Sequence, residues 1–256
     1  QKFPVNDDMK EDAATIIKQI KSAYKSNYGD NYKDSLNQAL TSAGYKNLSE
    51  YRQKMIKQIQ YANFLLDYID DHFDDVFNDY YQQCAPKYVS LIKISVSDTS
   101  SPTDDETSKL NEVKELISNT DKSFGDIAQD YSNDSTSSKK GSLGIVDSKD
   151  TSGIANSYGK DVFNAIEALS EGQVSDVITG DDGYYFVKVT STDKKTLKKE
   201  LKKTDIDSPL LAYDDYLQYV VYNSYKINYK DKDIKKIVQE VVNKALEERK
   251  TERGEA

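Results

Sequence analysis

The sequence has no tryptophan, one cysteine and one histidine among its 256 residues. The single cysteine, Cys84, excludes an intramolecular disulfide framework and a cysteine-rich zinc site. Aspartates cluster at positions 70, 71, 74 and 75, but the glycine and terminal glutamate of a calcium-binding loop are missing. We interpret this cluster as the solvated start of a helix, and we predict neither a metal nor a cofactor.

Long apolar runs and clustered positive charge are missing as well. No run approaches the ~18 apolar residues that a membrane-spanning helix needs. The formal net charge is −9 and the pI is near 4.8. Because a surface that binds nucleic acid requires clustered Lys and Arg, we expect no nucleic acid as a partner. Gln1 is not a natural initiator, so we expect that a leader segment has been removed.

Tyrosine, in contrast, is abundant, with 20 Tyr against 7 Phe. Its ring is apolar while its hydroxyl stays hydrated, which suits thin helical domains and adaptable binding faces. Tyrosine can equally replace other aromatic residues in a core. Tyr216, Tyr219 and Tyr222 are spaced by three, with Tyr213 before them and Tyr225 after them. A continuous helix would wind these rings around its surface, so we predict that some of Tyr213, Tyr216, Tyr219 and Tyr222 line a client-binding face.

Residues 1–86 show helical periodicity throughout. Apolar residues from Met9 to Tyr24 recur at helical spacing, with Asn6 to Asp8 as the expected cap and Gly29 as the expected end. We expect further helices at about 32–40, from Asn47 onward and at about 74–83. Helical periodicity returns from about Lys194 to Leu246.

Residues 124–189 show a different pattern of expected helices, loops and strands. A short helix from Phe124 leads into a polar loop that ends at GSLG, residues 141–144, and then into a short apolar strand. A second helix carries Phe163, Ile166 and Leu169. Two strands, 174–178 and 184–189, follow and are joined by Gly180-Asp-Asp-Gly183, which is typical of a hairpin.

These runs together resemble the parvulin family of peptidyl-prolyl isomerases. The resemblance is carried by YSNDSTSSKKGSLG, EALSEGQVSDVI and DGYYFVKV, and by YVSLIKISV in the place of the family's first strand. It covers roughly residues 87–192 and implies an α+β domain with a four-stranded antiparallel sheet. Catalytic parvulins carry one histidine in the first strand and one in the last. Here Leu91 and Tyr185 occupy those positions, and the only histidine, His72, lies outside the domain.

The resemblance also implies where the remains of a parvulin site lie. Asp134 occupies the family's Cys/Asp position, and Tyr158 falls on the rim of the expected pocket. Val146 and Val162 fall where apolar side chains line that pocket. Asp134 can equally be a loop cap for the amides of Ser137 and Ser138, and Leu91 can be plain core packing. We predict a degenerate site made of Asp134, Tyr185 and Leu91.

The order of segments resembles the PrsA-type foldases of Gram-positive bacteria and, more distantly, the periplasmic chaperone SurA. Proline residues mark the joints, among them Pro86 and Pro209. We therefore predict a parvulin-like domain, 87–192, inserted into an all-helical chaperone domain made of 1–86 and 193–256. The resemblance implies an extracytoplasmic protein, lipid-anchored through the missing leader to the outer face of the cell membrane.

Three functions are compatible with the sequence. The first is a foldase or chaperone that binds unfolded or partly folded exported proteins, with an isomerase domain that is weak or inactive. The second is an active peptidyl-prolyl cis-trans isomerase acting on Xaa-Pro peptides. The third is a non-catalytic cell-surface interaction protein. Whether the chain forms a homodimer stays open.

Overall fold

The computed structural model describes residues 3–119, 121–201 and 206–255. Within these residues the contacts divide the chain into two compact units. The helical unit holds residues 3–72, 206–207 and 215–255, and the sheet unit holds residues 73–119, 121–201 and 208–214. No helix of the described residues has the length and apolar character to cross a membrane.

The helical unit begins with three helices that the sequence predicts well. Asn6 caps α1 by accepting a hydrogen bond from the amide of Met9, and Gly29 ends this helix. Asn47 caps α3 by accepting a hydrogen bond from the amide of Glu50. The helices are α1 (Asp7–Tyr28), α2 (Tyr32–Ser42) and α3 (Leu48–Asp71), with a 3-10 turn η1 (Gly29–Asn31) between the first two. Their core is formed by Met9, Ala13, Ile17, Met55, Ile56 and Ile59.

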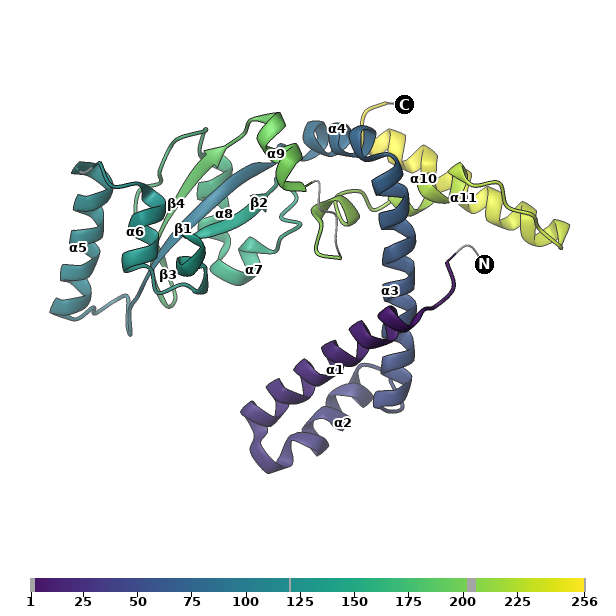
Figure 1. The fold of residues 1–256 in the computed structure, drawn as a ribbon, viewed down its shortest axis with the longest axis horizontal. Coiled ribbons are helices and arrows are strands. Elements are labelled where there is room, and N and C mark those ends of the chain that lie inside the picture. Colours follow the sequence, from purple (N-terminus) through teal and green to yellow (C-terminus); the bar gives the residue numbers. More distant parts are fainter. Residues whose placement is uncertain (1–2, 120, 202–205, 256) are drawn as a thin grey trace. The chain divides into compact units, whose positions relative to one another are not determined.

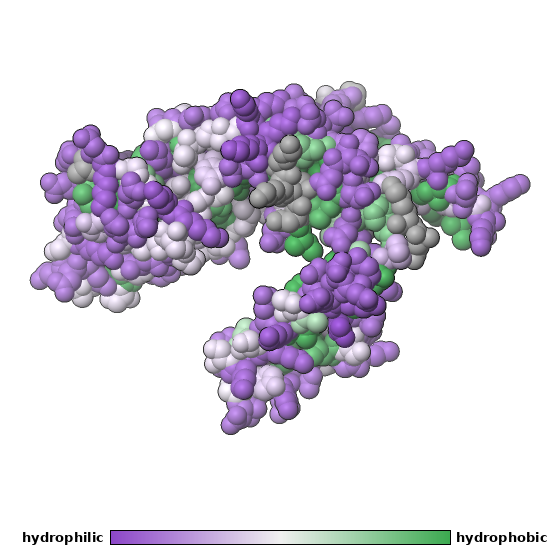
Figure 2. Space-filling view, in the orientation of Figure 1, coloured by the Kyte–Doolittle hydropathy of each residue, from purple (hydrophilic) through white to green (hydrophobic). Residues whose placement is uncertain are grey.

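The C-terminal part of the helical unit consists of α10 (Leu217–Ser224) and α11 (Lys232–Glu252). Helix α10 contacts both α3 and α11. The predicted continuous helix through Tyr213 and Tyr216 is wrong, because a 3-10 turn η3 (Pro209–Leu211) and a non-helical segment precede α10. The apolar stripe of α11 is only partly covered: Ile234, Ile237 and Val241 are each at least half exposed (Figure 2).

The sheet unit contains the predicted four-stranded antiparallel sheet, in the order β2-β1-β4-β3 (Figure 1). The strands are β1 (Lys87–Ser95), β2 (Ser142–Val146), β3 (Ile178–Gly180) and β4 (Gly183–Ser191). The predicted strand 174–178 is shorter and later than expected, since Val174 makes only an isolated bridge with Lys188. Gly180 pairs with Gly183 to close the expected hairpin.

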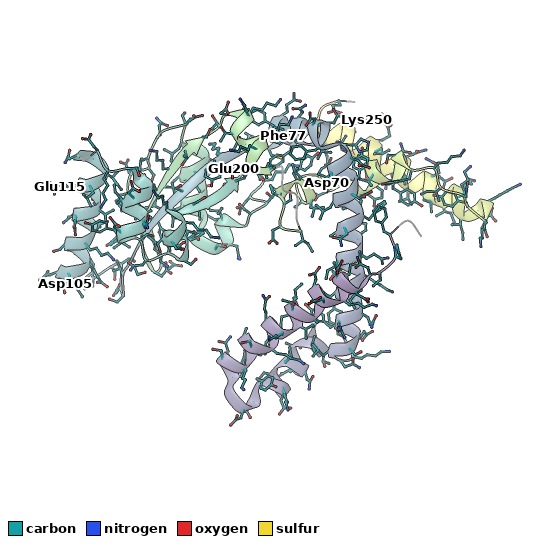
Figure 3. The ribbon with its side chains drawn as sticks, viewed as in Figure 1. Asp70, Phe77, Asp105, Glu115, Glu200 and Lys250 are labelled. Atoms are coloured by element: carbon teal, nitrogen blue, oxygen red, sulfur yellow. The ribbon has the colours of Figure 1, made fainter. Side chains whose placement is uncertain are left out.

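Helices cover both faces of this sheet. Ile92, Ile94 and Phe186 point to the face packed by α5 (Asp104–Asn119) and α6 (Phe124–Tyr131). Figure 3 labels Asp105 and Glu115 on α5. Alternate residues of β1 and β4 point to the other face, because side chains alternate along a strand. That face is packed by α7 (Ile154–Tyr158) and α8 (Lys160–Ala168), and its core contains Val89, Leu91, Tyr185 and Val187.

Two further helices belong to the sheet unit, α4 (Phe73–Cys84) before β1 and α9 (Lys194–Leu201) after β4. The contacts therefore divide the chain near residue 72, whereas the sequence places a boundary after residue 86. The reason lies in α4: Phe77 (Figure 3), Tyr80 and Cys84 are fully buried, and the Tyr80 hydroxyl donates to the buried carboxylate of Asp147 at 2.8 Å. The domains 1–86, 87–192 and 193–256 stay a prediction about which parts fold independently.

Candidate functional site

A cleft of about 570 Å³ lies on the α7 and α8 side of the sheet unit. One wall comes from Tyr158 and the start of α8, including Val162, and the other from the β3-β4 hairpin with Asp182. Tyr185 of β4 lines the same cleft. The cleft therefore brings together the sequence-predicted residues Tyr158, Val162 and Tyr185.

Tyr185, which stands at the second histidine position of catalytic parvulins, contacts two charged neighbours, Asp182 and Lys93. Its hydroxyl donates to Asp182, and Lys93 pairs with the same carboxylate. The Lys93 Nζ also lies 5.6 Å from the centroid of the Tyr185 ring. Burial raises the pKa of Tyr185, and the hydrogen bond to Asp182 raises it further. The phenol is thus neutral at physiological pH.

Asp134 caps the 3-10 turn η2 (Ser135–Lys139). Its carboxylate accepts hydrogen bonds from the amide of Thr136 at 2.8 Å and from the Thr136 hydroxyl at 2.6 Å. The Tyr158 hydroxyl lies 3.5 Å from the same carboxylate. Burial and this neighbouring charge raise the pKa of Tyr158 to about 12. Asp134 therefore acts as a loop cap, to Thr136 and not to the expected Ser137 and Ser138, and also borders Tyr158.

Leu91 and Val146 are fully buried in the core on this face of the sheet. Neither lines the cleft, whereas Val162 does. Leu91 has no hydrogen-bonding group, so the first histidine position contributes packing alone. A role for Leu91 or Val146 in substrate contact stays a prediction.

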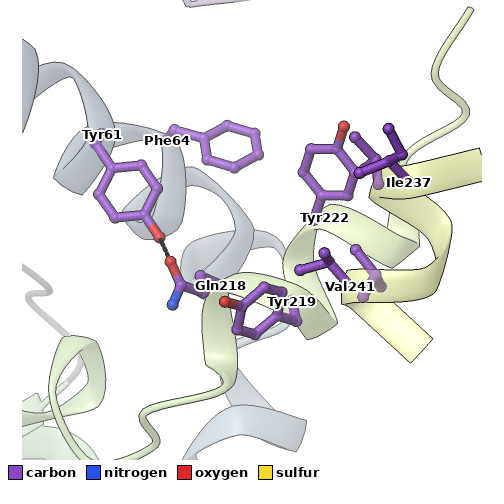
Figure 4. A pocket seen from close by; sticks show the side chains of 9 residues that line it. Tyr61, Phe64, Gln218, Tyr219, Tyr222, Ile237 and Val241 are labelled. Carbon is purple, nitrogen blue, oxygen red and sulfur yellow. Dashed lines mark hydrogen bonds between the residues drawn. The ribbon is translucent and has the colours of Figure 1, made fainter. Parts of the chain in front are cut away.

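The helical unit contains a second candidate site, an apolar groove between α3, α10 and α11 (Figure 4). Its volume is about 310 Å³, and a neighbouring hollow between α3 and the segment after α10 adds about 710 Å³. The Tyr61 hydroxyl donates to Gln218 across the groove at 2.7 Å. We call this the α10 groove, and its lining includes Tyr61, Phe64, Tyr219, Tyr222, Ile237 and Val241.

The four tyrosines predicted to form a client face separate in the structure. Tyr219 and Tyr222 line the α10 groove. The Tyr216 hydroxyl donates to Glu252 at 2.9 Å, and its ring lies 6.3 Å from that of Tyr219. Tyr213 belongs to the sheet unit and is only 2% exposed. The assignment of Tyr213 to a client face is therefore wrong, because its ring packs edge-to-face on Tyr80.

Sequence reasoning missed Asp182 in the cleft and Lys93 beside it, and Tyr61 and Phe64 in the α10 groove. A signal was available for Lys93, because it stands two residues after Leu91 and so lies on the same face of β1. The groove residues of α3 carried no such signal, since their helix is apolar on more than one side.

Residues 91–191 match the family model of the PPIC-type PPIASE domain, the rotamase family. This segment of the chain is therefore a parvulin-type rotamase domain. About half of the chain is similar to the foldase protein PrsA. The PrsA proteins of Staphylococcus aureus (strain MRSA252) and Staphylococcus epidermidis (strain ATCC 12228 / FDA PCI 1200) are each 32% identical over 141 residues. The matches cover 52% of this chain and 41% of each relative, so the chain spans about two fifths of their length.

Solved structures of PrsA are similar to the chain as well. PrsA from Bacillus subtilis matches with a TM-score of 0.40 and 21% identity, over 91% of this chain and 80% of that one. PrsA from Streptococcus pneumoniae (strain Canada MDR_19A) matches with a TM-score of 0.42 and 19% identity, over 90% of this chain and 81% of that one.

Proposed function

We propose that this protein is an extracytoplasmic foldase of the PrsA kind that binds non-native exported proteins. Its relation to PrsA foldases supports the class, and the α10 groove is the observation that carries the binding role. We further propose that the protein acts at the outer face of the cell membrane through a lipid anchor. Its clients are unfolded or partly folded exported chains.

The α10 groove suits such clients because of what its side chains expose. Ile237 is 60% exposed, Val241 50% and Tyr61 45%. Exposed apolar side chains are costly in water, and a non-native client offers apolar surface to cover them. Tyrosine rings add contact area that adapts to many sequences. An open groove of this kind favours a chaperone over a surface protein whose helical domain is closed and fully packed.

The parvulin-type domain supplies a second binding surface with little isomerase activity. Isomerisation must cross a barrier of ~18–20 kcal/mol, which a site lowers by dipoles aimed at the twisted amide. The Leu91 side chain offers no dipole, and the Tyr185 hydroxyl already donates to Asp182. Residual isomerase activity on Xaa-Pro peptides is the second candidate function, and the open cleft beside Tyr158 and Tyr185 favours it.

Replacing Ile237 by Ser tests the binding role. The variant should suppress aggregation of an unfolded client several-fold less well than the wild type, while its melting temperature stays within a few degrees. Ile234→Ser is the matched control, because Ile234 is 54% exposed on the same helix but does not line the groove. Equal losses in both variants, or no loss in either, would contradict the role of the α10 groove.

A further inference from the structure

Lys93, Asp182 and Tyr185 form a connected set on one side of the cleft. Lys93 and Tyr185 are directly opposite each other on the paired strands β1 and β4. Asp182, in the hairpin turn, accepts from both the Lys93 ammonium and the Tyr185 hydroxyl. The Lys93 side chain is 18% exposed and that of Asp182 is 64% exposed, so the carboxylate reaches from solvent toward a mostly covered ammonium group and a buried tyrosine.

The hairpin is shaped to receive the Tyr185 ring. A Cβ atom at Gly180 would lie 2.7 Å from Cε2 of Tyr185, so any larger residue would displace the ring. On its other side the ring meets Tyr158 edge-to-face, with the centroids 6.2 Å apart and the planes at 80°. Four neighbours therefore restrain one aromatic ring in the cleft: Lys93, Asp182, Gly180 and Tyr158.

We propose that Asp182 and Lys93 are positioning residues that hold the Tyr185 ring as a fixed wall for proline-containing peptides. This inference rests on the proposed function of the parvulin-type domain. It assigns a role to the Asp182 carboxylate and the Lys93 ammonium group, neither of which a histidine-based site would need. The peptide meets the small part of the Tyr185 ring that lines the cleft, because the residue is only 3% exposed and its hydroxyl is engaged by Asp182.

The protonation states of Lys93, Asp182 and Tyr185 keep the hydrogen bonds to Asp182 in place at neutral pH. The hydrogen bond from Lys93 lowers the pKa of Asp182, and the bond from Tyr185 lowers it further. Asp182 is thus an acceptor and Tyr185 a donor across the physiological range. A hydrogen bond to a charged acceptor is among the stronger ones, so the ring orientation survives thermal motion. The same bond withholds the hydroxyl proton from a peptide carbonyl, which makes the cleft better suited to binding than to catalysis.

The test combines two measurements on the full chain. The first follows the Tyr185 ring by NMR with tyrosine labelled at the ε carbons, and Tyr185→Phe assigns its signals. Because the hydroxyl lies on the axis about which the ring flips, the position of the ring is read from nuclear Overhauser contacts between its ε protons and the Cα protons of Gly180, against which the ring packs, rather than from its flip rate. We expect these contacts in the wild type and their loss in Asp182→Ala. Their absence from the wild type, or their persistence unchanged in Asp182→Ala, would overturn the proposal.

The second measurement is the Kd of the peptide Ala-Ala-Pro-Phe, blocked at both ends, in a double-mutant cycle. Asp182→Ala and Tyr185→Phe should each weaken binding about tenfold, as loss of a charged hydrogen bond does. The double variant should be no weaker than either single one, because both remove the same hold. Additive losses would overturn the positioning role.

Asp176→Ala is the matched control, since Asp176 is exposed in the segment before β3 and outside the cleft lining. Its peptide Kd should equal that of the wild type. A tenfold loss of affinity in Asp176→Ala would mean that Asp182 acts only through net charge, and it would overturn the proposal. A wild type with a held ring that binds no peptide would overturn the binding role of the wall and the proposed function of the cleft. The suppression of client aggregation by the α10 groove would then still stand.

Discussion

The cleft of the sheet unit and the α10 groove of the helical unit are both lined by tyrosine, but the group that accepts a hydrogen bond from the tyrosine hydroxyl differs between them. In the cleft, Tyr185 donates to the carboxylate of Asp182, and Tyr158 borders Asp134. In the α10 groove, Tyr61 donates to the neutral Gln218. Tyr185 is 3% exposed and Tyr61 is 45% exposed. A charged acceptor and burial fix a ring, whereas a neutral acceptor at the surface leaves it adaptable.

This difference indicates two kinds of recognition in one chain. A fixed ring selects ligands by shape, because its position cannot adjust to a poor fit. Adaptable rings and exposed aliphatic side chains accept many sequences at low selectivity. We therefore propose that the chain combines a selective cleft for a proline-sized group with an unselective groove for apolar segments of non-native chains.

The largest expected effect separates the two regions. Phe77 of α4 is fully buried, so Phe77→Ala should lower the free energy of unfolding by about 3–5 kcal/mol. Because α4 belongs to the sheet unit, amide hydrogen exchange should rise in β1 and β4 and much less in α1 and α3. An equal rise in both units would show that α4 supports the helical unit as well. Gln82→Ala on the exposed side of α4 serves as the control.

A smaller effect is expected at the hydroxyl of Tyr80. Tyr80→Phe leaves the fully buried carboxylate of Asp147 with one hydrogen bond fewer, which should cost about 1–3 kcal/mol. Tyr81→Phe, on the same helix, removes only a partly buried bond to the carbonyl of Thr192. Urea unfolding measures both. A Tyr81 variant that loses as much as the Tyr80 variant would contradict the special role of Asp147.

Restoring the two histidines tests whether the cleft can be made catalytic. Leu91→His with Tyr185→His should raise the rate of prolyl isomerisation about tenfold, equivalent to about 1.4 kcal/mol in the barrier. Leu91→His alone should cost stability without a gain in rate, since Leu91 is fully buried. A protease-coupled assay on an Xaa-Pro peptide measures the rate. No gain in a folded double variant would mean that the geometry of the cleft, beyond the histidines, prevents catalysis.

The smallest expected effect is on the pH profile of peptide binding, which should be flat between about pH 5 and pH 8, the range in which histidine titrates. The charged or titratable groups facing Tyr185 are Lys93, Asp182, Tyr158 and Asp134. The pKa of Asp182 in the folded protein is lowered from its usual value. Asp182 therefore stays charged and keeps its hydrogen bonds at any pH above that usual value. It loses them only in strong acid, as the pH falls through the folded pKa. The raised pKa values of Tyr185 and Tyr158 keep both hydroxyls protonated over this pH range. A binding midpoint near pH 6 would contradict this account of the cleft.

Much of the fold follows from local sequence signals. Caps such as Asn6 and Asn47, and the hairpin glycines Gly180 and Gly183, act within a few residues, so their positions are predictable. The membership of α4 in the sheet unit depends on the contact between Tyr80 and Asp147, which lie 67 residues apart. No local pattern signals such a contact.

The candidate site was predictable to a similar extent. Tyr185 and Tyr158 follow from their place in the parvulin motifs, but the bonds of Asp182 depend on how the hairpin turn folds over β4. Tyr213 was misplaced because its spacing from Tyr216 suggested one helix, while Pro209 starts a 3-10 turn and the helix begins only at Leu217. Periodicity alone does not show where a helix begins.

One preparation of the wild-type chain, assayed in two ways, tests the foldase proposal most directly. Aggregation of an unfolded client is followed beside protease-coupled isomerisation of an Xaa-Pro peptide at the same protein concentration. We expect aggregation to be suppressed near equimolar protein, while isomerisation stays close to its uncatalysed relaxation of ~10–100 s. Fast isomerisation without suppression of aggregation would contradict the proposal and identify the chain as an isomerase first.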